Sequence, residues 1–203
     1  MTSVSLRSVD RTRIAILDAA KSVLRERGCA GLSTRDVASA ADVPLSQIHY
    51  HFGSKQGLII AVFEHQNAQL LDRQTALYAD PTMPISAQWE LACNYLDDDL
   101  ASGYVRVLME LWAAGWSDPG IARVVKDGVT GWIDLLSTVA RRAETQFGSL
   151  GPFSADDIAA LVGAAFIGAE AALLLELESE KIPIRQALRR VGAAIKILES
   201  GRG

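Results

Sequence analysis

Cysteine and long apolar runs are scarce in this sequence of 203 residues, and each shortage excludes a class of protein. Cys29 and Cys93 lie far apart and match neither a disulfide framework nor a metal-binding spacing, so we expect a reduced, cytoplasmic chain. The longest apolar run, residues 158–169, is shorter than the ~20 residues that a membrane span needs. The first 13 residues lack the apolar core of a signal peptide. The sequence therefore predicts a soluble protein without a membrane partner.

Arrangements of residues that carry chemistry are missing as well. No nucleophile–base pair, metal-ligand spacing or phosphate-binding loop is visible, and the acidic run at residues 97–99 is typical of a solvated helix end. His49 and His51 diverge on a helix because they are two residues apart, and the third histidine, His65, is remote. We therefore predict that the protein is not an enzyme and has no metal site and no cofactor.

Helix-forming apolar sequence is abundant. Hydrophobic residues make up 49% of the chain, with Ala and Leu dominant, and strand-like alternation is rare, which predicts an all-α fold.

The charge is unevenly distributed along the chain. Residues 1–60 carry eight Lys/Arg against five Asp/Glu, a net +3, whereas residues 61–203 carry twelve against nineteen, a net −7. Any binding to a polyanion is therefore predicted at the N-terminal end.

Residues 31–58, GLSTRDVASAADVPLSQIHYHFGSKQGL, predict two short helices joined by a tight turn. Ser33 is suited to cap the first helix, and Asp42 can make the turn because Asp tolerates the left-handed conformation. Pro44 fits the start of the second helix, residues 44–51, whose large inward anchors are Val43, Ile48 and Phe52. A helix this short is not held by its own propensity, so we infer that its outer face has a partner.

The segments GLSTRDVA, VPLSQIHYHF and GSKQGL resemble, in this order, the DNA-binding domain of the tetracycline-repressor (TetR) family of bacterial regulators. The resemblance implies a helix-turn-helix whose second helix enters the major groove of double-stranded DNA. Two positions depart from the family pattern: Asp42 replaces a usual Gly, and His49, with Tyr50 beside it, replaces a usual phosphate-contacting Tyr. The implied DNA-binding residues are Thr34, Arg35, Pro44, Leu45, Ser46, Gln47, His49, Tyr50 and Lys55.

These residues have different expected tasks. Gln47 can form two hydrogen bonds to adenine, Leu45 can contact a thymine methyl, and Arg35 matches a position from which family members often reach a base. Thr34, His49, Tyr50 and Lys55 are expected at phosphates.

The rest of the chain predicts further helices. A helix at residues 10–27, stopped by Gly28, should pack behind the two short ones, and residues 1–9 read as a polar arm. The other predicted helices are residues 55–78, 86–101, 104–116, 121–147, 154–178 and 184–199, with breaks at 79–84 and 148–152. We predict a DNA-binding domain at residues 1–53, including the arm, and a helical effector-binding and dimerisation domain at residues 54–203.

The C-terminal part combines aromatic side chains with small residues. Aromatic and methionine side chains with scattered polar groups favour an effector pocket, although plain core packing explains each residue alone. The pocket candidates are Trp89, Tyr95, Tyr104, Arg106, Met109, Trp112, Trp116 and Trp132. Small and apolar residues on the last two helices favour a homodimer interface, with ordinary packing inside one chain as the alternative. The interface candidates are Ile158, Leu161, Ala165, Ala169, Leu188, Val191 and Ile195.

The sequence and the resemblance together predict a ligand-responsive regulator, a repressor, that binds a palindromic operator as a dimer. A small, largely apolar effector would release it by shifting the helix at residues 55–78. The alternative is a helical dimeric adaptor or ligand-binding protein without sequence-specific DNA binding. An enzyme using the aromatic region is a third class, which the absence of catalytic groups disfavours.

Overall fold

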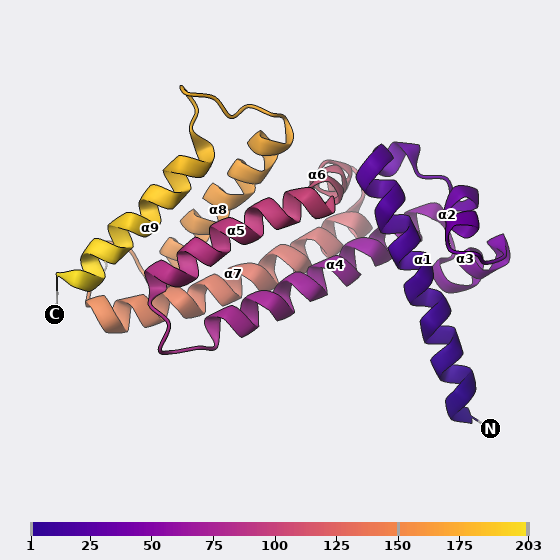
Figure 1. Ribbon diagram of the computed structural model, residues 1–203, viewed down its shortest axis with the longest axis horizontal. Helices are drawn as coiled ribbons and strands as arrows, with labels where there is room; N and C mark the ends of the chain where they lie inside the picture. The colour runs from indigo at the N-terminus through magenta and orange to yellow at the C-terminus, as the bar shows by residue number, and fades with distance from the viewer. Residues whose placement is uncertain (1, 150, 202–203) are drawn as a thin grey trace. The chain divides into compact units, whose positions relative to one another are not determined.

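The computed structural model describes residues 2–149 and 151–201, which are helical apart from loops and an isolated bridge between Ser179 and Ile182 (Figure 1). This confirms the predicted all-α class. Leu150, in the predicted 148–152 loop, lies outside the described residues. The helices are α1 (Thr2–Gly31), α2 (Thr34–Ala40), α3 (Leu45–Phe52), α4 (Lys55–Tyr78), α5 (Ile85–Ser102), α6 (Tyr104–Gly115), α7 (Pro119–Phe147), α8 (Ala155–Leu174) and α9 (Ile184–Ser200).

Local signals place most helix ends where the sequence predicts them. The α4 bounds are those predicted, and Ser154 caps α8 through a capping box with Asp157. Two predictions are wrong. The α8 helix ends at Leu174, four residues before the predicted end, and α1 begins at Thr2, so residues 2–9 are helical and form no separate arm. No Gly or Pro stands between residues 2 and 27 to stop the helix from extending.

The chain divides into two compact units. The first contains Met1–Ala68 and Ser102–Val125, and the second contains Gln69–Ala101 and Lys126–Gly203. The first unit thus joins α1, α2 and α3 to α6, a helix that follows them by about fifty residues. The helices α4 and α7 each begin in the first unit and end in the second. This division differs from the sequence-based boundary after residue 53.

The core of the first unit is formed by apolar side chains that lie on the inner faces of its helices. On α1 these recur at three- and four-residue spacing, as the sequence predicts. Fully or almost fully buried are Ile16, Leu17, Leu24, Val37, Ile48, Leu58, Val62, Phe63 and Val105. The Tyr104 ring stacks on Phe63 at a centroid distance of 5.8 Å, and its hydroxyl donates to Asn67 Oδ1 at 2.9 Å. Its neighbours in this unit thus satisfy both the apolar ring and the polar hydroxyl of Tyr104.

A break at Gly28 joins α1 to α6. Gly28 leaves the helical conformation with φ 68° and ψ −177°, so the predicted stop is confirmed, although a last helical turn continues to Gly31. The Cys29 backbone N–H that the break frees donates to Glu110 Oε2 at 2.6 Å. Arg106 holds the other Glu110 oxygen at 3.1 Å. A charged carboxylate on α6 thus satisfies a backbone group that the helix no longer pairs.

The second unit has its own core, centred on α5 and α8. The buried members of this core cluster are Cys93, Leu96, Phe166, Ala169, Leu173 and Leu188, with Trp89 and Trp132 packed against them. The Trp89 indole N–H donates to the Leu188 carbonyl at 2.7 Å, which ties α5 to α9. Gly192 makes room for the same indole, since a Cβ there would lie 2.8 Å from Trp89. Close approach of α9 to α5 therefore requires Gly at this position.

We predict that Gly28→Ala destabilises the protein by about 2 kcal/mol or more, because it combines a positive φ with a clash. A Cβ at Gly28 would lie 2.6 Å from Glu110 Oε1. Gly168→Ala is the control, since nothing lies within 4 Å of its Cβ and Ala favours the helix. Urea unfolding of the three proteins measures both effects, and equal stability of Gly28→Ala and the wild type would contradict the account of the break.

Candidate functional site

The turn between α2 and α3 follows the chemistry of its residues. Ser33 Oγ accepts the Asp36 N–H at 3.4 Å and caps α2, while the Asp36 carboxylate pairs with Arg27 of α1 at 2.9 Å. Asp42 adopts φ 53°, which confirms the prediction that it makes the turn in place of Gly. The chain then enters α3 after Pro44, which lies at the N-cap position with φ −59°.

The orientation of α3 is fixed by one buried side chain. Ile48 has no exposed surface, while the Phe52 ring is half-buried beneath Arg13, whose guanidinium lies 5.7 Å from the ring centroid. The side chains on the opposite face point outward, and Tyr50 is 75% exposed. Of the predicted DNA-binding residues, the exposed ones are Arg35, Pro44, Ser46, His49, Tyr50 and Lys55, and the half-buried ones are Thr34, Leu45 and Gln47.

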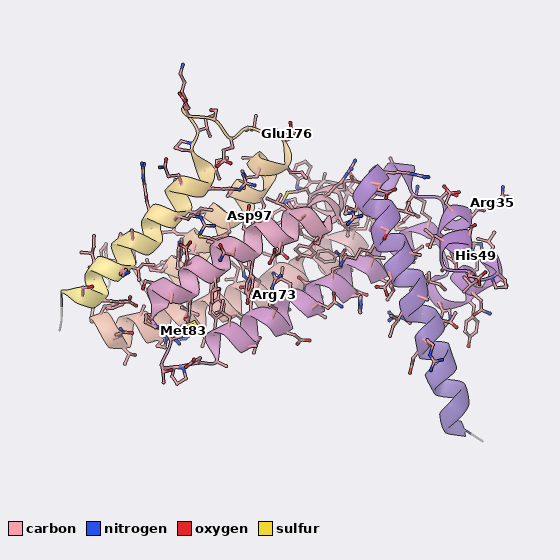
Figure 2. All side chains as sticks on the ribbon, in the orientation of Figure 1. Arg35, His49, Arg73, Met83, Asp97 and Glu176 are labelled. Carbon is pink, nitrogen blue, oxygen red and sulfur yellow. The ribbon has the colours of Figure 1, made fainter. Side chains whose placement is uncertain are left out.

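Figure 2 labels two members of this surface, Arg35 on α2 and His49 on α3. His49 Nδ1 lies 3.3 Å from the Gly53 carbonyl oxygen. Lys55 Nζ donates to the Ala30 carbonyl at 3.0 Å, near the end of α1. Lys55 therefore has a structural partner besides its predicted phosphate, since its ammonium group stabilises a helix end where carbonyls lack partners. We refer to the nine residues together as the α2–α3 surface.

The family model described as "Bacterial regulatory proteins, tetR family" matches residues 16–62, which cover the second half of α1, all of α2 and α3, and the start of α4. Residues 16–62 belong to the TetR family. The predicted resemblance is therefore confirmed, and the α2–α3 surface is the outer face of a TetR-type helix-turn-helix.

Relatives of known role agree with this assignment. The HTH-type transcriptional repressor NicS of Pseudomonas putida is 36% identical over 96 residues, which cover 47% of this chain and 45% of NicS. The HTH-type transcriptional regulator BetI of Burkholderia cenocepacia is 25% identical, with 61% and 64% covered. The chain thus spans less than two thirds of these relatives. They are transcriptional regulators, not enzymes, which agrees with the expected class of protein.

Structural similarity to solved regulators extends beyond the matched segment. A transcriptional regulator from Saccharomonospora viridis, solved in complex with choline, superposes with a TM-score of 0.72 at 22% identity, covering 89% of this chain and 95% of that one. At this identity the similarity establishes the fold alone. The helical part after the helix-turn-helix therefore has the same fold as the corresponding part of that regulator.

The structure distributes the predicted pocket residues over both compact units. Tyr104, Arg106, Met109, Trp112 and Trp116 lie in the first, and Trp89, Tyr95 and Trp132 lie in the second. Two of them have other surroundings than a pocket offers: Trp116 is 81% exposed, and Arg106 pairs with Glu110. Trp116 is exposed because it comes just after the last residue of α6. Arg106 has an ion-pair partner instead of a pocket because it lies on the side of α6 that faces α1.

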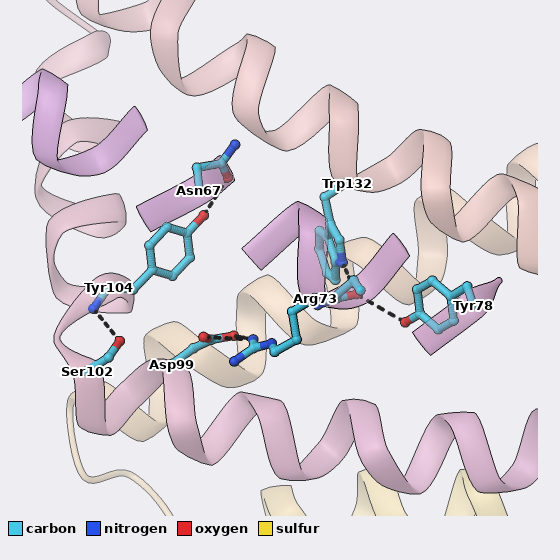
Figure 3. A network of polar contacts seen from close by, with 8 residues as sticks. Asn67, Arg73, Tyr78, Asp99, Ser102, Tyr104 and Trp132 are labelled. Carbon is cyan, nitrogen blue, oxygen red and sulfur yellow. Dashed lines mark hydrogen bonds and ion pairs between the residues drawn. The ribbon is translucent and has the colours of Figure 1, made fainter. Parts of the chain in front are cut away.

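In the second unit, α4, α5 and α7 bring polar and aromatic side chains together (Figure 3). The Trp132 indole N–H and the Tyr78 hydroxyl both donate to Gln74 Oε1, at 3.0 and 3.1 Å. Arg73 donates to both oxygens of Asp99 at 2.8 and 2.9 Å, and its guanidinium lies 4.0 Å from the Tyr95 ring centroid. The prediction of a solvated end at residues 97–99 is therefore wrong for Asp99, which is buried because Arg73 neutralises it.

Glu170 is a second buried acid that the sequence analysis missed. It interrupts the apolar sequence of α8 and is 8% exposed. Burial, with a smaller contribution from the charge of Asp99, raises the pKa of the Glu170 carboxyl to about 8. The signal was present in the sequence, since a single Glu stands between the alanines at 169 and 171. A buried carboxyl of this kind is a common feature of functional sites.

Other groups of the described residues offer less chemistry. No set of three or more His, Cys, Asp or Glu side chains in this part of the chain is arranged to hold a metal ion. Burial raises the pKa of the Cys29 thiol to about 12 and that of Cys93 to about 11, so neither is a ready nucleophile.

The predicted dimer residues separate into two groups. Ala169 and Leu188 are buried in the core cluster of their own chain, which the sequence did not reveal because a helix that is apolar all round does not show which face turns inward. Leu161 and Val191 are 56% and 43% exposed and Ala165 is exposed, while Ile158 and Ile195 are half-buried.

Among the described helices, α8 alone has the length and hydropathy of a membrane span, and 33% of its most apolar stretch of 18 residues is buried.

We predict that stability falls as the pH rises towards the Glu170 pKa. The folded protein keeps a proton that the unfolded chain, with its ordinary Glu pKa of 4.5, has released. The proton-linked stability is therefore complete below about pH 4.5 and lost by about pH 8. Between pH 6 and 8.5 the free energy of unfolding should drop by about 2–3 kcal/mol from this group.

Denaturant unfolding at several pH values measures this fall. Glu170→Gln should remove it, and Glu180→Gln, at an exposed position, should retain it. Identical pH profiles for the wild type and Glu170→Gln would contradict the assignment.

Proposed function

We propose that this chain is a ligand-responsive transcriptional regulator of the cytoplasm, a repressor that binds a palindromic operator as a homodimer. The observation that carries the proposal is the outer face of α3, which stays exposed while Ile48 alone anchors the helix fully. Ser46, His49 and Tyr50 on that face are exposed, and a helix of this size fits the major groove. The identity to NicS, a transcriptional repressor, supports the same function.

The domains of the proposed regulator have separate tasks. Residues 1–53 bind DNA, and residues 54–203 bind a small, largely apolar effector and dimerise. The structural neighbour solved with choline supports a small-molecule effector. Since α4 is continuous from Lys55 to Tyr78, an effector that shifts it changes the position of the helix-turn-helix. Recognition helices must stand ~34–36 Å apart to enter successive major grooves, so a few ångströms of shift releases the operator.

Dimerisation is proposed through α8 and α9. Exposed apolar side chains gather on these helices and on the segment between them: Leu161, Leu174, Leu175, Leu177, Ile182, Val191, Ile197 and Leu198. A helix-turn-helix monomer reads few bases, and a symmetric pair doubles the contacts. A second copy of the chain that covers these side chains also explains a property of α8. This helix is as apolar as a membrane span, yet only 33% of its most apolar stretch is buried inside one chain.

We predict that Gln47→Ala relaxes the preference for one base pair, by about 1–3 kcal/mol of discrimination, without a large loss on other sequences. Tyr50→Phe should weaken binding to all duplexes alike, because it removes only a phosphate-facing hydroxyl. Lys126→Ala, at an exposed basic residue of α7, is the control and should leave both properties unchanged. Selection of duplexes from a random pool, followed by affinity measurements across a salt series, tests these expectations.

The alternative, a dimeric adaptor without DNA recognition, predicts a different result of the same experiment. It requires that the pool return no preferred sequence and that Gln47→Ala and Tyr50→Phe behave as the wild type. Such an outcome would refute the proposed regulator.

We predict that Leu161→Glu converts the dimer to a monomer, because two buried carboxylates would face each other across the interface. Operator affinity should then fall at least tenfold. Trp116→Glu, which also charges an exposed apolar site but lies outside α8 and α9, is the matched control and should stay dimeric. Sedimentation velocity gives the oligomeric state, and a Leu161→Glu protein that remains a dimer would exclude this face.

A further inference from the structure

Glu170 lies in surroundings that do not suit a carboxyl group. Phe166 stands one turn before it on α8 and Leu173 one turn after it, and both belong to the core cluster that Trp89 and Trp132 flank. The Phe166 ring packs edge-on against Trp89 at 5.5 Å and against Trp132 at 6.2 Å between centroids. The Glu170 side chain is 8% exposed, and the contacts given for the described residues assign its carboxyl no hydrogen bond or ion pair. Moving a carboxyl group into apolar surroundings lowers the stability of the folded state, and binding groups often carry such a cost.

The charged group that acts on Glu170 is another acid, not a base. Asp99 on α5 is the charged group that acts on it, and Asp99 is already neutralised by Arg73 of α4. The α5 thiol of Cys93 stays protonated because burial raises its pKa to about 11. The core-cluster residues of α7 and α9 are Trp132, Ile184 and Leu188, none of which ionises. Asp99 thus has the Arg73 guanidinium as its countercharge, whereas Glu170 stays neutral by keeping a proton.

The same unit already holds one organic cation between an aromatic ring and an acid. The Arg73 guanidinium lies over Tyr95 and binds both oxygens of Asp99, as Figure 3 shows for the ion pair. Aromatic faces attract cations, and the attraction is strongest where water is excluded. An anionic ligand would instead meet two acids and a guanidinium that is already engaged. The chemistry around Glu170 thus favours a positive ligand.

We propose that Glu170, with the aromatic side chains of Trp89, Trp132 and Phe166, forms a site for an organic cation such as a quaternary ammonium ion. The inference rests on the proposed function, because it assigns a chemical class to the effector of the C-terminal domain. On binding, the cation replaces the Glu170 proton, which passes to solvent, and no covalent bond changes. Binding is therefore linked to pH through this one carboxyl.

The test is calorimetric titration of the full chain with benzyltrimethylammonium and choline, in two buffers of different ionisation enthalpy. At pH 7 each cation should release ~0.9 proton per site, and affinity should rise about tenfold from pH 6 to pH 7 and level off above pH 8. The neutral choline isostere 3,3-dimethylbutanol should bind at least tenfold more weakly, without proton release. Benzoate serves as the anionic probe.

Variants separate the role of Glu170 from folding. Glu170→Gln should lose the proton release and at least tenfold in affinity for the cations, and Glu180→Gln should keep both. Since a folding defect could mimic the first result, infrared difference spectra of the wild type supply a second measurement: cation binding should remove the band of a protonated carboxyl.

Three results would overturn the proposal: binding of the cations without proton release, tighter binding of benzoate, or no binding of either cation. Duplex selection on the same preparation separates this failure from that of the proposed function. Sequence-specific DNA binding without cation binding removes only the cation site, whereas loss of sequence preference removes the regulator itself.

Discussion

The burial of Ile48 is the constraint on which the rest of the N-terminal domain depends. With eight residues, α3 is too short to be helical by its own propensity, so it exists because its single fully buried side chain is held by the helices around it. Anchoring one face leaves the opposite face turned outward, and the outward-turned side of α3 carries the half-buried Gln47 and the exposed Tyr50. Asp42 in the left-handed conformation sets the angle at which α3 leaves α2. Core packing and the proposed DNA recognition thus use opposite faces of α3.

A second dependence runs from α1 to α6. The break at Gly28 exposes a backbone N–H, and Glu110 binds it while Arg106 holds the same carboxylate and reaches towards the Arg25 carbonyl. Gly103, at the start of α6, lies so close to α1 that a Cβ there would stand 2.9 Å from Arg25 Cβ. These contacts explain why α6 belongs to the same compact unit as the helix-turn-helix. In the proposed regulator, any change that an effector imposes on α6 acts directly on the DNA-binding helices.

In the second unit, the buried Glu170 lowers the stability of the core. A Leu at the position of Glu170 would suit the neighbours Phe166 and Leu173, whereas the acid requires a proton to remain buried at neutral pH. Asp99 shows the alternative solution, since Arg73 and Tyr95 supply its countercharge within the chain. The contrast between a satisfied acid and an unsatisfied one is the feature that distinguishes a structural ion pair from a candidate binding group.

The sequence by itself determined the local features of this protein: most of the helix bounds, the Asp42 turn, the Ser154 cap and the family of residues 16–62. The bounds, the turn and the cap depend on residues within a few positions of one another. Only the tertiary structure decided what is buried. It placed Ala169 and Leu188 in the core, turned Asp99 and Glu170 inward and left Trp116 in solvent. Burial depends on neighbours far along the chain, and a helix with apolar residues on every side gives no local sign of which side they cover.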